Sequence, residues 1–238
     1  IFADQLNAAL KRGGKILIPA FAVDRTEVIL MKIRQLIEER KIPQTPIYVD
    51  SPMALKALDY YRQAINEGSS EIRREIIDRW QGKDPFDPGM LNQMHTTEQS
   101  ISLNKIITNA IIISASGMGT GGRVVHHLEQ ILPDQSSTVI LVGFQAAGTR
   151  GRSLLDGMSQ IKMFGQLVPV VAKIEHIESF SVHADSNELI TWLKVIKNPK
   201  QVFVVHGDPI SAQTFAKRLQ SELGFNAITP EFAKTYSV

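Results

Sequence analysis

The sequence contains no cysteine, an absence that excludes both a disulfide framework and a zinc site held by thiolates. It also lacks a secretory signal pattern and any apolar run near the ~18–20 residues that span a bilayer, so we expect a cytoplasmic protein with no membrane partner. The sequence also lacks a large excess of either charge, since 26 basic and 24 acidic residues leave a formal net charge of +2. Any affinity for a polyanion must therefore come from a local cluster of cations.

What is present is the composition of an ordinary globular protein, with 238 residues, 43% of them hydrophobic and 21% charged. The chain begins at Ile1 within a helical pattern, so we expect it to be part of a longer protein. Short apolar runs alternate with amphipathic helical periods, which is typical of an α/β fold with a mainly parallel sheet flanked by helices. The apolar runs predicted as sheet strands are residues 15–19, 46–50, 110–114 and 138–143.

Two regions depart from this alternation. Residues 68–99 give a weaker signal, with a helical pattern at 71–81 and a loop after it, and we expect an excursion over the edge of the sheet. Residues 160–164 and 168–177 are both rich in strand formers and are separated by three residues that include Gly165, a spacing that predicts a hairpin.

Two histidines near the end of the chain each follow an apolar run and precede a helix start. After His183, Asp185 and Glu188 have the spacing of a capping box, and after His206 a proline stands at the first helical position. This pattern predicts two imidazoles on one rim of a sheet, at the carboxyl ends of its strands, where α/β folds bind ligands. A buried core histidine is the usual alternative, but both residues stand beside turn residues rather than in an apolar face.

A glycine-rich turn joins the strand at 110–114 to the next helix. Residues from Ser116 to Gly122 lie there, and glycine lets the backbone approach a ligand while the helix N-terminus favours phosphate. The spacing is neither G-x-G-x-x-G nor a Walker A loop, so a tight structural turn is an equally good interpretation.

Arginines occur in three loops that each follow a strand. They are Arg25, Arg123 and the pair Arg150 and Arg152. A single surface arginine is usually just a solvated charge. Three such loops on one rim favour a cationic groove, and the fork of guanidinium donors suits phosphate.

The other four histidines are weaker candidates for chemistry. Two of them are adjacent in a helix, where neighbouring side chains point in different directions and cannot both face one ligand. We interpret all four as structural or solvated, and they are His95, His126, His127 and His176.

Several motifs in register resemble one known family. GGKILIPAFAVDR, PIYVDSPMA, ISASGMGTGGR, VGFQAAGTRGRSLLDG, SFSVHAD and VVHGDP occur in the order seen in β-CASP metallo-β-lactamase-fold RNA nucleases, relatives of the cleavage and polyadenylation endonuclease. The resemblance covers nearly the whole chain. It implies that residues 1–176 are the β-CASP domain and that 177–238 are the C-terminal strand-helix segment of the metallo-β-lactamase (RNA-specificity) domain.

The resemblance also implies roles for single residues. His183 matches the family's motif B, a catalytic histidine beside the scissile phosphate, and Ser181 in the same motif is assigned to substrate binding. His206 matches motif C, a zinc ligand in members that act on RNA. The implied substrate-binding set on the β-CASP side is Arg25, Ser116, Gly122, Arg123, Arg150 and Arg152.

One departure from the family pattern limits what this chain does alone. The H-x-H-x-D-H metal signature and the acidic motif A are absent and would lie upstream of Ile1. The resemblance implies two zinc ions in the full-length parent and RNA held between its two domains. We expect the isolated chain to hold no catalytic zinc and to cut no RNA, because a zinc site needs several ligands.

Two other functional classes stay open on the sequence. One is a non-catalytic RNA-processing scaffold related to these nucleases, and the other is a nucleotide-binding α/β module that uses the turn from Ser116 to Gly122. Endonucleolytic and exonucleolytic cleavage are equally compatible with the motifs, and a homodimer is one option for the oligomeric state.

Overall fold

The computed structural model describes residues 1–80 and 82–237. It divides into two compact units, one of residues 1–182 and one that starts at His183. Gln81, the last residue of the helical pattern at 71–81, and Val238, the last residue of the expected C-terminal segment, lie outside the described residues.

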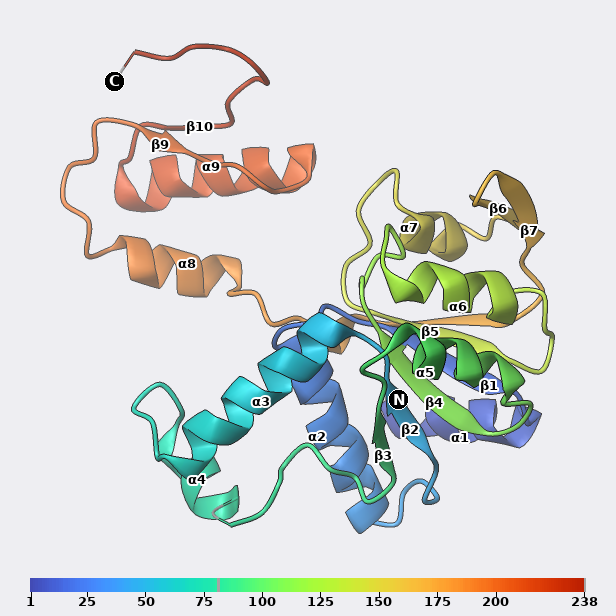
Figure 1. Ribbon diagram of the computed structural model, residues 1–238. Coiled ribbons are helices and arrows are strands. Elements are labelled where there is room, and N and C mark those ends of the chain that lie inside the picture. The colour runs from blue at the N-terminus through green and yellow to red at the C-terminus, as the bar shows by residue number, and fades with distance from the viewer. Residues whose placement is uncertain (81, 238) are drawn as a thin grey trace. The chain divides into compact units, whose positions relative to one another are not determined.

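The first unit is built on a six-stranded, entirely parallel sheet with the strand order β3-β2-β4-β1-β5-β8 (Figure 1). The strands are β1 (Lys15–Pro19), β2 (Ile47–Val49), β3 (Leu91–Gln93), β4 (Ala110–Ser114), β5 (Thr138–Val142) and β8 (Lys173–Ile177). Strands β4 and β5 are buried at every position. Burial on both faces explains why they are continuous apolar runs rather than alternating ones. The predicted α/β class with a parallel sheet is confirmed.

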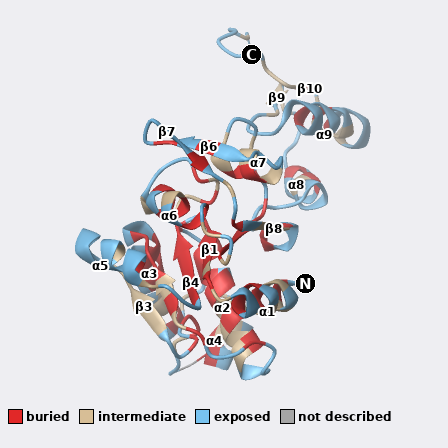
Figure 2. Ribbon diagram, turned by 90° about the vertical axis from the view of Figure 1, so that its right-hand side faces the viewer, coloured by how far each residue is buried: buried red, intermediate tan, exposed pale blue. Residues whose placement is uncertain are grey.

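Helices cover both faces of this sheet, and the strands alternate their side chains between the two layers. Ile16 and Ile18 of β1 belong to the core on the side of α1 to α4, whereas Leu17 belongs to the core on the side of α6 and α7. Figure 2 shows the buried strands between these layers. The helices are α1 (Phe2–Arg12), α2 (Arg25–Glu38), α3 (Pro52–Asn66), α4 (Arg74–Trp80), α5 (Thr97–Ser102), α6 (Arg123–Ile131) and α7 (Arg150–Leu155).

Local sequence sets several of these boundaries. Gly13 ends α1 in the left-handed conformation, with φ of 87°, which glycine adopts at no steric cost. Ser51 caps α3 by accepting a hydrogen bond from the backbone of Ala54, and Pro52 occupies the first helical position. These are the stop and start signals that the sequence carries.

Two predicted segments differ from the structure in detail. The hairpin exists, but it is the short pair β6 (Gln160–Met163) and β7 (Gln166–Pro169), and the chain then continues into the separate parallel strand β8. After β7, the backbone of Val170 still donates to the carbonyl of Ser159 in the hairpin register, whereas Val171 and Ala172 donate to the carbonyl of Leu132, so the chain leaves the hairpin before β8 begins. The excursion at 68–99 contains α4 and also β3, which pairs with β2 as the edge strand of the sheet.

The second unit is small. It contains α8 (Ser186–Leu193), β9 (Val202–Phe203), α9 (Pro209–Leu223) and β10 (Ala227–Ile228), and β9 pairs with β10 in a parallel ladder of its own. Its core consists of Ile190, Leu193, Ala216, Leu219 and Ala227. The capping box of Asp185 and Glu188 at the start of α8 is present as predicted.

The expectation of two histidines on one rim of a sheet is wrong. The strand before His183 is β8, which pairs with β5 in the large sheet, whereas the strand before His206 is β9, which pairs with β10. Local sequence marks each strand but does not encode which sheet it joins. The two compact units divide after Val182, because β8 and the short helix η2 (Glu178–Phe180) pack with the first unit, and the family-domain boundary expected at residue 176 stays a prediction.

Candidate functional site

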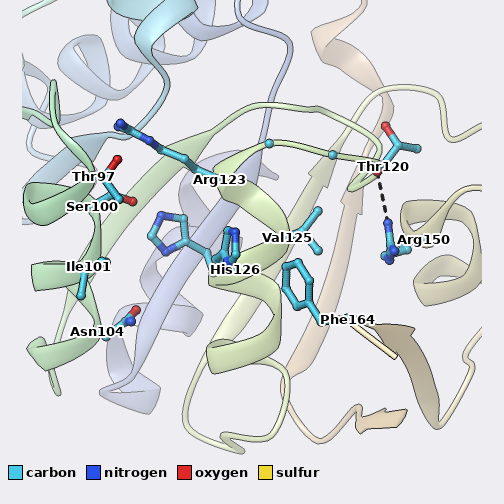
Figure 3. Close-up of a pocket in the computed structure, with 13 residues that line it drawn as sticks. Thr97, Ser100, Ile101, Asn104, Thr120, Arg123, Val125, His126, Arg150 and Phe164 are labelled. Atoms are coloured by element: carbon cyan, nitrogen blue, oxygen red, sulfur yellow. Dashed lines mark hydrogen bonds between the residues drawn. The ribbon is translucent and has the colours of Figure 1, made fainter. Parts of the chain in front are cut away.

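A pocket of about 600 Å³ lies in the first unit beside the N-terminus of α6. Figure 3 shows its walls: α5 residues on one side, Arg123 and His126 of α6 in the middle, and Arg150 and Phe164 on the other side. The complete lining is Thr97, Ser100, Ile101, Asn104, Thr120, Gly121, Gly122, Arg123, Val125, His126, His127, Arg150 and Phe164. Three residues predicted to bind substrate, Gly122, Arg123 and Arg150, therefore come together in one place.

A buried carboxylate organises the base of this pocket. Asp50, which follows β2, is fully buried and accepts hydrogen bonds from Arg123 Nη1 at 2.7 Å and Ser100 Oγ at 2.6 Å, and lies 2.6 Å from His127 Nε2. Arg123 Nη1 also donates to the carbonyl of Met94 at 2.8 Å. The network joins β2, α5 and α6, so it fixes the direction in which α6 leaves β4.

The charge of Asp50 is stabilised by these partners. Burial alone would raise the pKa of Asp50, but hydrogen bonds from His127, Ser100 and Arg123 outweigh burial, and its pKa lies below the ordinary value. The carboxylate therefore neutralises the charge of Arg123, whose side chain is 20% exposed. Little uncompensated positive charge remains at Arg123 for an anion.

Arg150 is differently placed. Its Nη1 donates to the carbonyls of Gly119 and Thr120 at 3.0 and 3.2 Å, and its Nε donates to the carbonyl of Lys162 at 3.2 Å. These partners carry no net charge, so they hold the guanidinium in place without neutralising it. Arg150 therefore supplies a fixed positive charge at the pocket.

The glycine-rich turn owes its shape to Ser116 and Gly122. Ser116 Oγ accepts from the backbone of Thr120 at 3.1 Å and lies 3.0 Å from its hydroxyl, so its side chain holds the turn from within. Gly122 has φ of 80°, and a Cβ there would lie 2.7 Å from the carbonyl oxygen of Ala115. Only glycine fits this position, which is a structural requirement independent of any ligand.

Two of the predicted arginines lie elsewhere. Arg25 is only 2% exposed, and it donates to the carbonyls of Phe180 at 3.1 Å and Val142 at 3.2 Å. Arg25 therefore does not take the place in a cationic groove that its sequence position predicts, because its side chain is buried and hydrogen-bonds to β5 and η2. Arg152 is exposed and pairs with Asp156 one turn further along, at 2.9 Å.

Ser181, His183 and His206 occupy exposed positions outside regular helices and strands. Ser181 lies in the first unit and His183 in the second. His206 lies between β9 and α9 with φ of 67°, a left-handed conformation that is uncommon for residues other than glycine and is often found at functional sites. Within residues 1–80 and 82–237, no three His, Asp or Glu side chains are grouped so that they could hold a metal ion.

The sequence interpretation missed the pairing of His126 with Phe164. It is correct that His126 and His127 point in different directions: His127 is 3% exposed and contacts Asp50, whereas His126 is exposed and stacks on Phe164. Phe164 lies at the tip of the β6–β7 hairpin, beside Gly165. An aromatic residue at a hairpin tip is a weak signal, and no local pattern indicates that it contacts a helix 38 residues earlier in the chain.

Two models of known domain families match the chain. Residues 26–154 match the Beta-Casp domain, and residues 167–230 match the Zn-dependent metallo-hydrolase RNA specificity domain. The chain is similar to Ribonuclease TTHA0252 of Thermus thermophilus, with 35% identity over 207 residues that cover 87% of this chain and 46% of that protein.

Two archaeal proteins are also similar. An RNase J-like protein of Methanocaldococcus jannaschii is 32% identical over 95% of this chain and 51% of its own length. Transcription termination factor FttA of Pyrococcus abyssi is 32% identical over 94% of this chain and 35% of its own length. The chain therefore spans about half of these relatives or less. Of the helices that the structure describes, none has the length and apolar character needed to span a bilayer.

Proposed function

The chain belongs to the β-CASP family of metallo-β-lactamase-fold RNA nucleases, and on this premise we propose that it is the RNA-holding part of a metal-dependent ribonuclease. The observation that carries the proposal is the order of two matched domains on one chain, Beta-Casp first and RNA specificity second. The ribonuclease names of two relatives support the same reaction class, hydrolysis of a phosphodiester bond.

In this proposal the two units supply different parts of the activity. The first unit contacts the RNA backbone through Arg150, the turn at Gly122 and, more weakly, Arg123 and Arg152. Such contacts position a strand without reading its sequence, because phosphate is the same at every nucleotide. Ser181, near the end of the first unit, contacts the substrate, and the second unit supplies His183 beside the phosphate that is cleaved and His206 as a metal ligand.

The part of the chain that the structure describes shows no group of side chains that could hold a catalytic zinc ion by itself. A catalytic zinc takes three protein ligands and an open position, and the described residues offer no group of three. His206 is therefore proposed as one ligand of a site whose other ligands these residues do not supply. An exposed imidazole held in a left-handed loop suits such a role, because its ring is free to meet a metal from outside the unit.

The test uses a protein in which this chain is joined to a complete metallo-hydrolase domain. His206→Ala should lower both the zinc content and the cleavage rate, because a direct ligand is lost. His183→Ala should leave the zinc content near that of the parent and lower the rate by about 10²–10⁴-fold, the range for losing a positioned acid or base. Zinc is measured by elemental analysis after dialysis, and cleavage on a labelled single-stranded RNA.

His95→Ala is the matched control, since His95 is an exposed histidine of the first unit. It should change neither the zinc content nor the rate. Equal zinc loss in the His183 and His206 variants would contradict the assigned roles, and full activity in both would contradict the proposed reaction.

A further inference from the structure

An exposed aromatic pair lines the pocket beside α6. The rings of His126 and Phe164 are stacked, with centroids 4.6 Å apart and planes 21° from parallel, and Phe164 is 54% exposed (Figure 3). Burial does not explain this stack, because both side chains remain open to solvent and both line the pocket. Each ring packs one face against the other, and both residues stay exposed, so ring surface remains that a further ring could cover.

The pair is held by rigid elements. His126 lies on α6, whose neighbouring residues Val125 and Leu128 are in the core, and the next residue, His127, anchors the helix to Asp50. Phe164 follows β6, whose Met163 is fully buried. The residues next to His126 and next to Phe164 in the chain are therefore anchored in the fold. This preorganises the two rings, which lose little conformational entropy when a third ring stacks on them.

The pocket combines a positive charge with polar side chains. Among the described residues that line it none is Asp or Glu, while Arg150 places a charge there that its carbonyl partners do not neutralise. Arg150 is also bonded to the carbonyl of Lys162 on β6, so the guanidinium and the stacked rings share one support. Thr97 and Asn104 add hydroxyl and amide groups on the opposite wall. The volume of about 600 Å³ is in the range of small-ligand sites.

We propose that this pocket binds one nucleotide of a single-stranded RNA, with its base extending the His126–Phe164 stack and its phosphate on Arg150. The proposal rests on the proposed function for the class of substrate and adds a subsite to it. Every base has a flat π-face, so stacking retains any nucleotide with little preference for sequence. The subsite holds a base, whereas the arginine loops hold only phosphate.

The experiment measures binding of two labelled oligomers to the 238-residue chain by fluorescence anisotropy. One is a short oligouridylate, and the other has the same ribose-phosphate backbone without bases. Phe164→Ala should weaken binding of oligouridylate by about 10-fold, within the range for removing one base-stacking aromatic. It should leave binding of the abasic oligomer and the salt dependence unchanged, because stacking releases no counterions.

Three further variants sharpen the result. His126→Ala should reproduce the base-dependent loss, and Phe164→Trp should retain binding, which guards against a folding defect in Phe164→Ala. Arg150→Gln should weaken both oligomers and flatten the slope of log affinity against log salt by about 0.7, the value for one phosphate on a single strand. Tyr60→Ala, at an aromatic side chain on α3 that is 63% exposed, is the matched control and should change nothing.

The outcomes separate this proposal from the proposed function. If Phe164→Ala behaves as Tyr60→Ala does while the parent chain binds oligouridylate, the nucleotide subsite is wrong and the RNA-holding role stands. If Phe164→Ala weakens the abasic oligomer as much as oligouridylate, the stack does not meet a base. If the parent chain binds neither oligomer, the subsite is overturned, and the zinc and cleavage measurements then decide the proposed function by themselves.

Discussion

At the scale of single residues, partners decide what a charged side chain can do. Arg25, Arg123 and Arg150 all follow strands and look alike in the sequence. Arg25 is buried between carbonyls, Arg123 is neutralised by Asp50, and only Arg150 keeps an uncompensated charge on a pocket wall. Sequence spacing predicted that arginines would stand near the carboxyl ends of the strands. It could not predict their pairing, because Asp50 lies 73 residues before Arg123.

The buried side chain of Glu27 should make the stability of the fold depend on pH. It is 3% exposed in the first turn of α2, and burial, with a smaller contribution from the charge of Asp24, raises its pKa from 4.5 to about 7. The folded state therefore retains a proton that the unfolded state has released, so stability should fall as pH rises from about 4.5 to about 7. A shift of this size corresponds to about 3 kcal/mol, at about 1.4 kcal/mol per pKa unit.

Glu27→Gln removes this ionisation while keeping the shape of the side chain. The variant should match the parent at pH 4.5 and exceed it in unfolding free energy by up to about 3 kcal/mol at pH 8, measured by urea denaturation. Glu71→Gln, at an exposed glutamate, is the control and should follow the parent at both pH values. An equal difference between parent and Glu27→Gln at the two pH values would show that Glu27 does not carry a raised pKa.

At the scale of elements, the sequence predicted what is local and missed what is long-range. The strands β1 and β4 have the predicted bounds, because uninterrupted apolar runs flanked by glycine or turn residues define them. The capping box at Asp185 was also predictable, since its partners are three residues apart. The membership of β8 and β9 in different sheets, and the contact of the hairpin tip with α6, depend on residues far away in the chain and have no local signal.

The close contact between Gly14 and the turn that precedes β5 tests a long-range contact of this kind. A Cβ at Gly14 would lie 2.4 Å from the backbone carbon of Ser136, in the turn between α6 and β5. Gly14→Ala must therefore push this turn away from the start of β1 and should destabilise the fold by about 1–3 kcal/mol, the usual cost of overpacking. The measurement is the unfolding free energy from denaturant titration.

The matched control is Gly121→Ala, at a glycine with nothing within 4 Å of its added Cβ. It should be neutral or slightly stabilising, because the methyl group meets open space and the unfolded chain loses entropy. Equal unfolding free energies of the two variants would mean that the turn after α6 can move to accommodate a methyl group at Gly14 without loss of stability.

At the scale of the whole molecule, the two units differ greatly in the core that supports them. The first has two layers of buried side chains around a six-stranded sheet. Among its described residues, the second has one small core cluster of five buried side chains. Domains of about 60 residues bury a smaller share of their surface than large ones and are marginally stable. We therefore expect the second unit to melt at a lower temperature than the first.

The boundary between the units can be tested by shortening the chain at two places. A chain that ends at Val182 keeps η2, in which Phe180 accepts a hydrogen bond from Arg25 at 3.1 Å and packs against Phe2 with ring centroids 4.9 Å apart. Its thermal unfolding should lose the lower transition and keep the upper one unchanged. The measurement is calorimetry of both shortened chains beside the full chain.

A chain that ends at Ile177 is the matched comparison, because it removes only five more residues but takes Phe180 with them. Phe180 is 7% exposed, and losing a buried phenylalanine costs about 3–5 kcal/mol, which corresponds to a fall of about 10 °C for a unit of this size. The loss also leaves the Arg25 guanidinium buried without one of its acceptors, which adds to the cost. If both shortened chains melt at the same temperature, η2 does not belong to the first unit and the boundary lies near residue 176, where the sequence motifs alone place it.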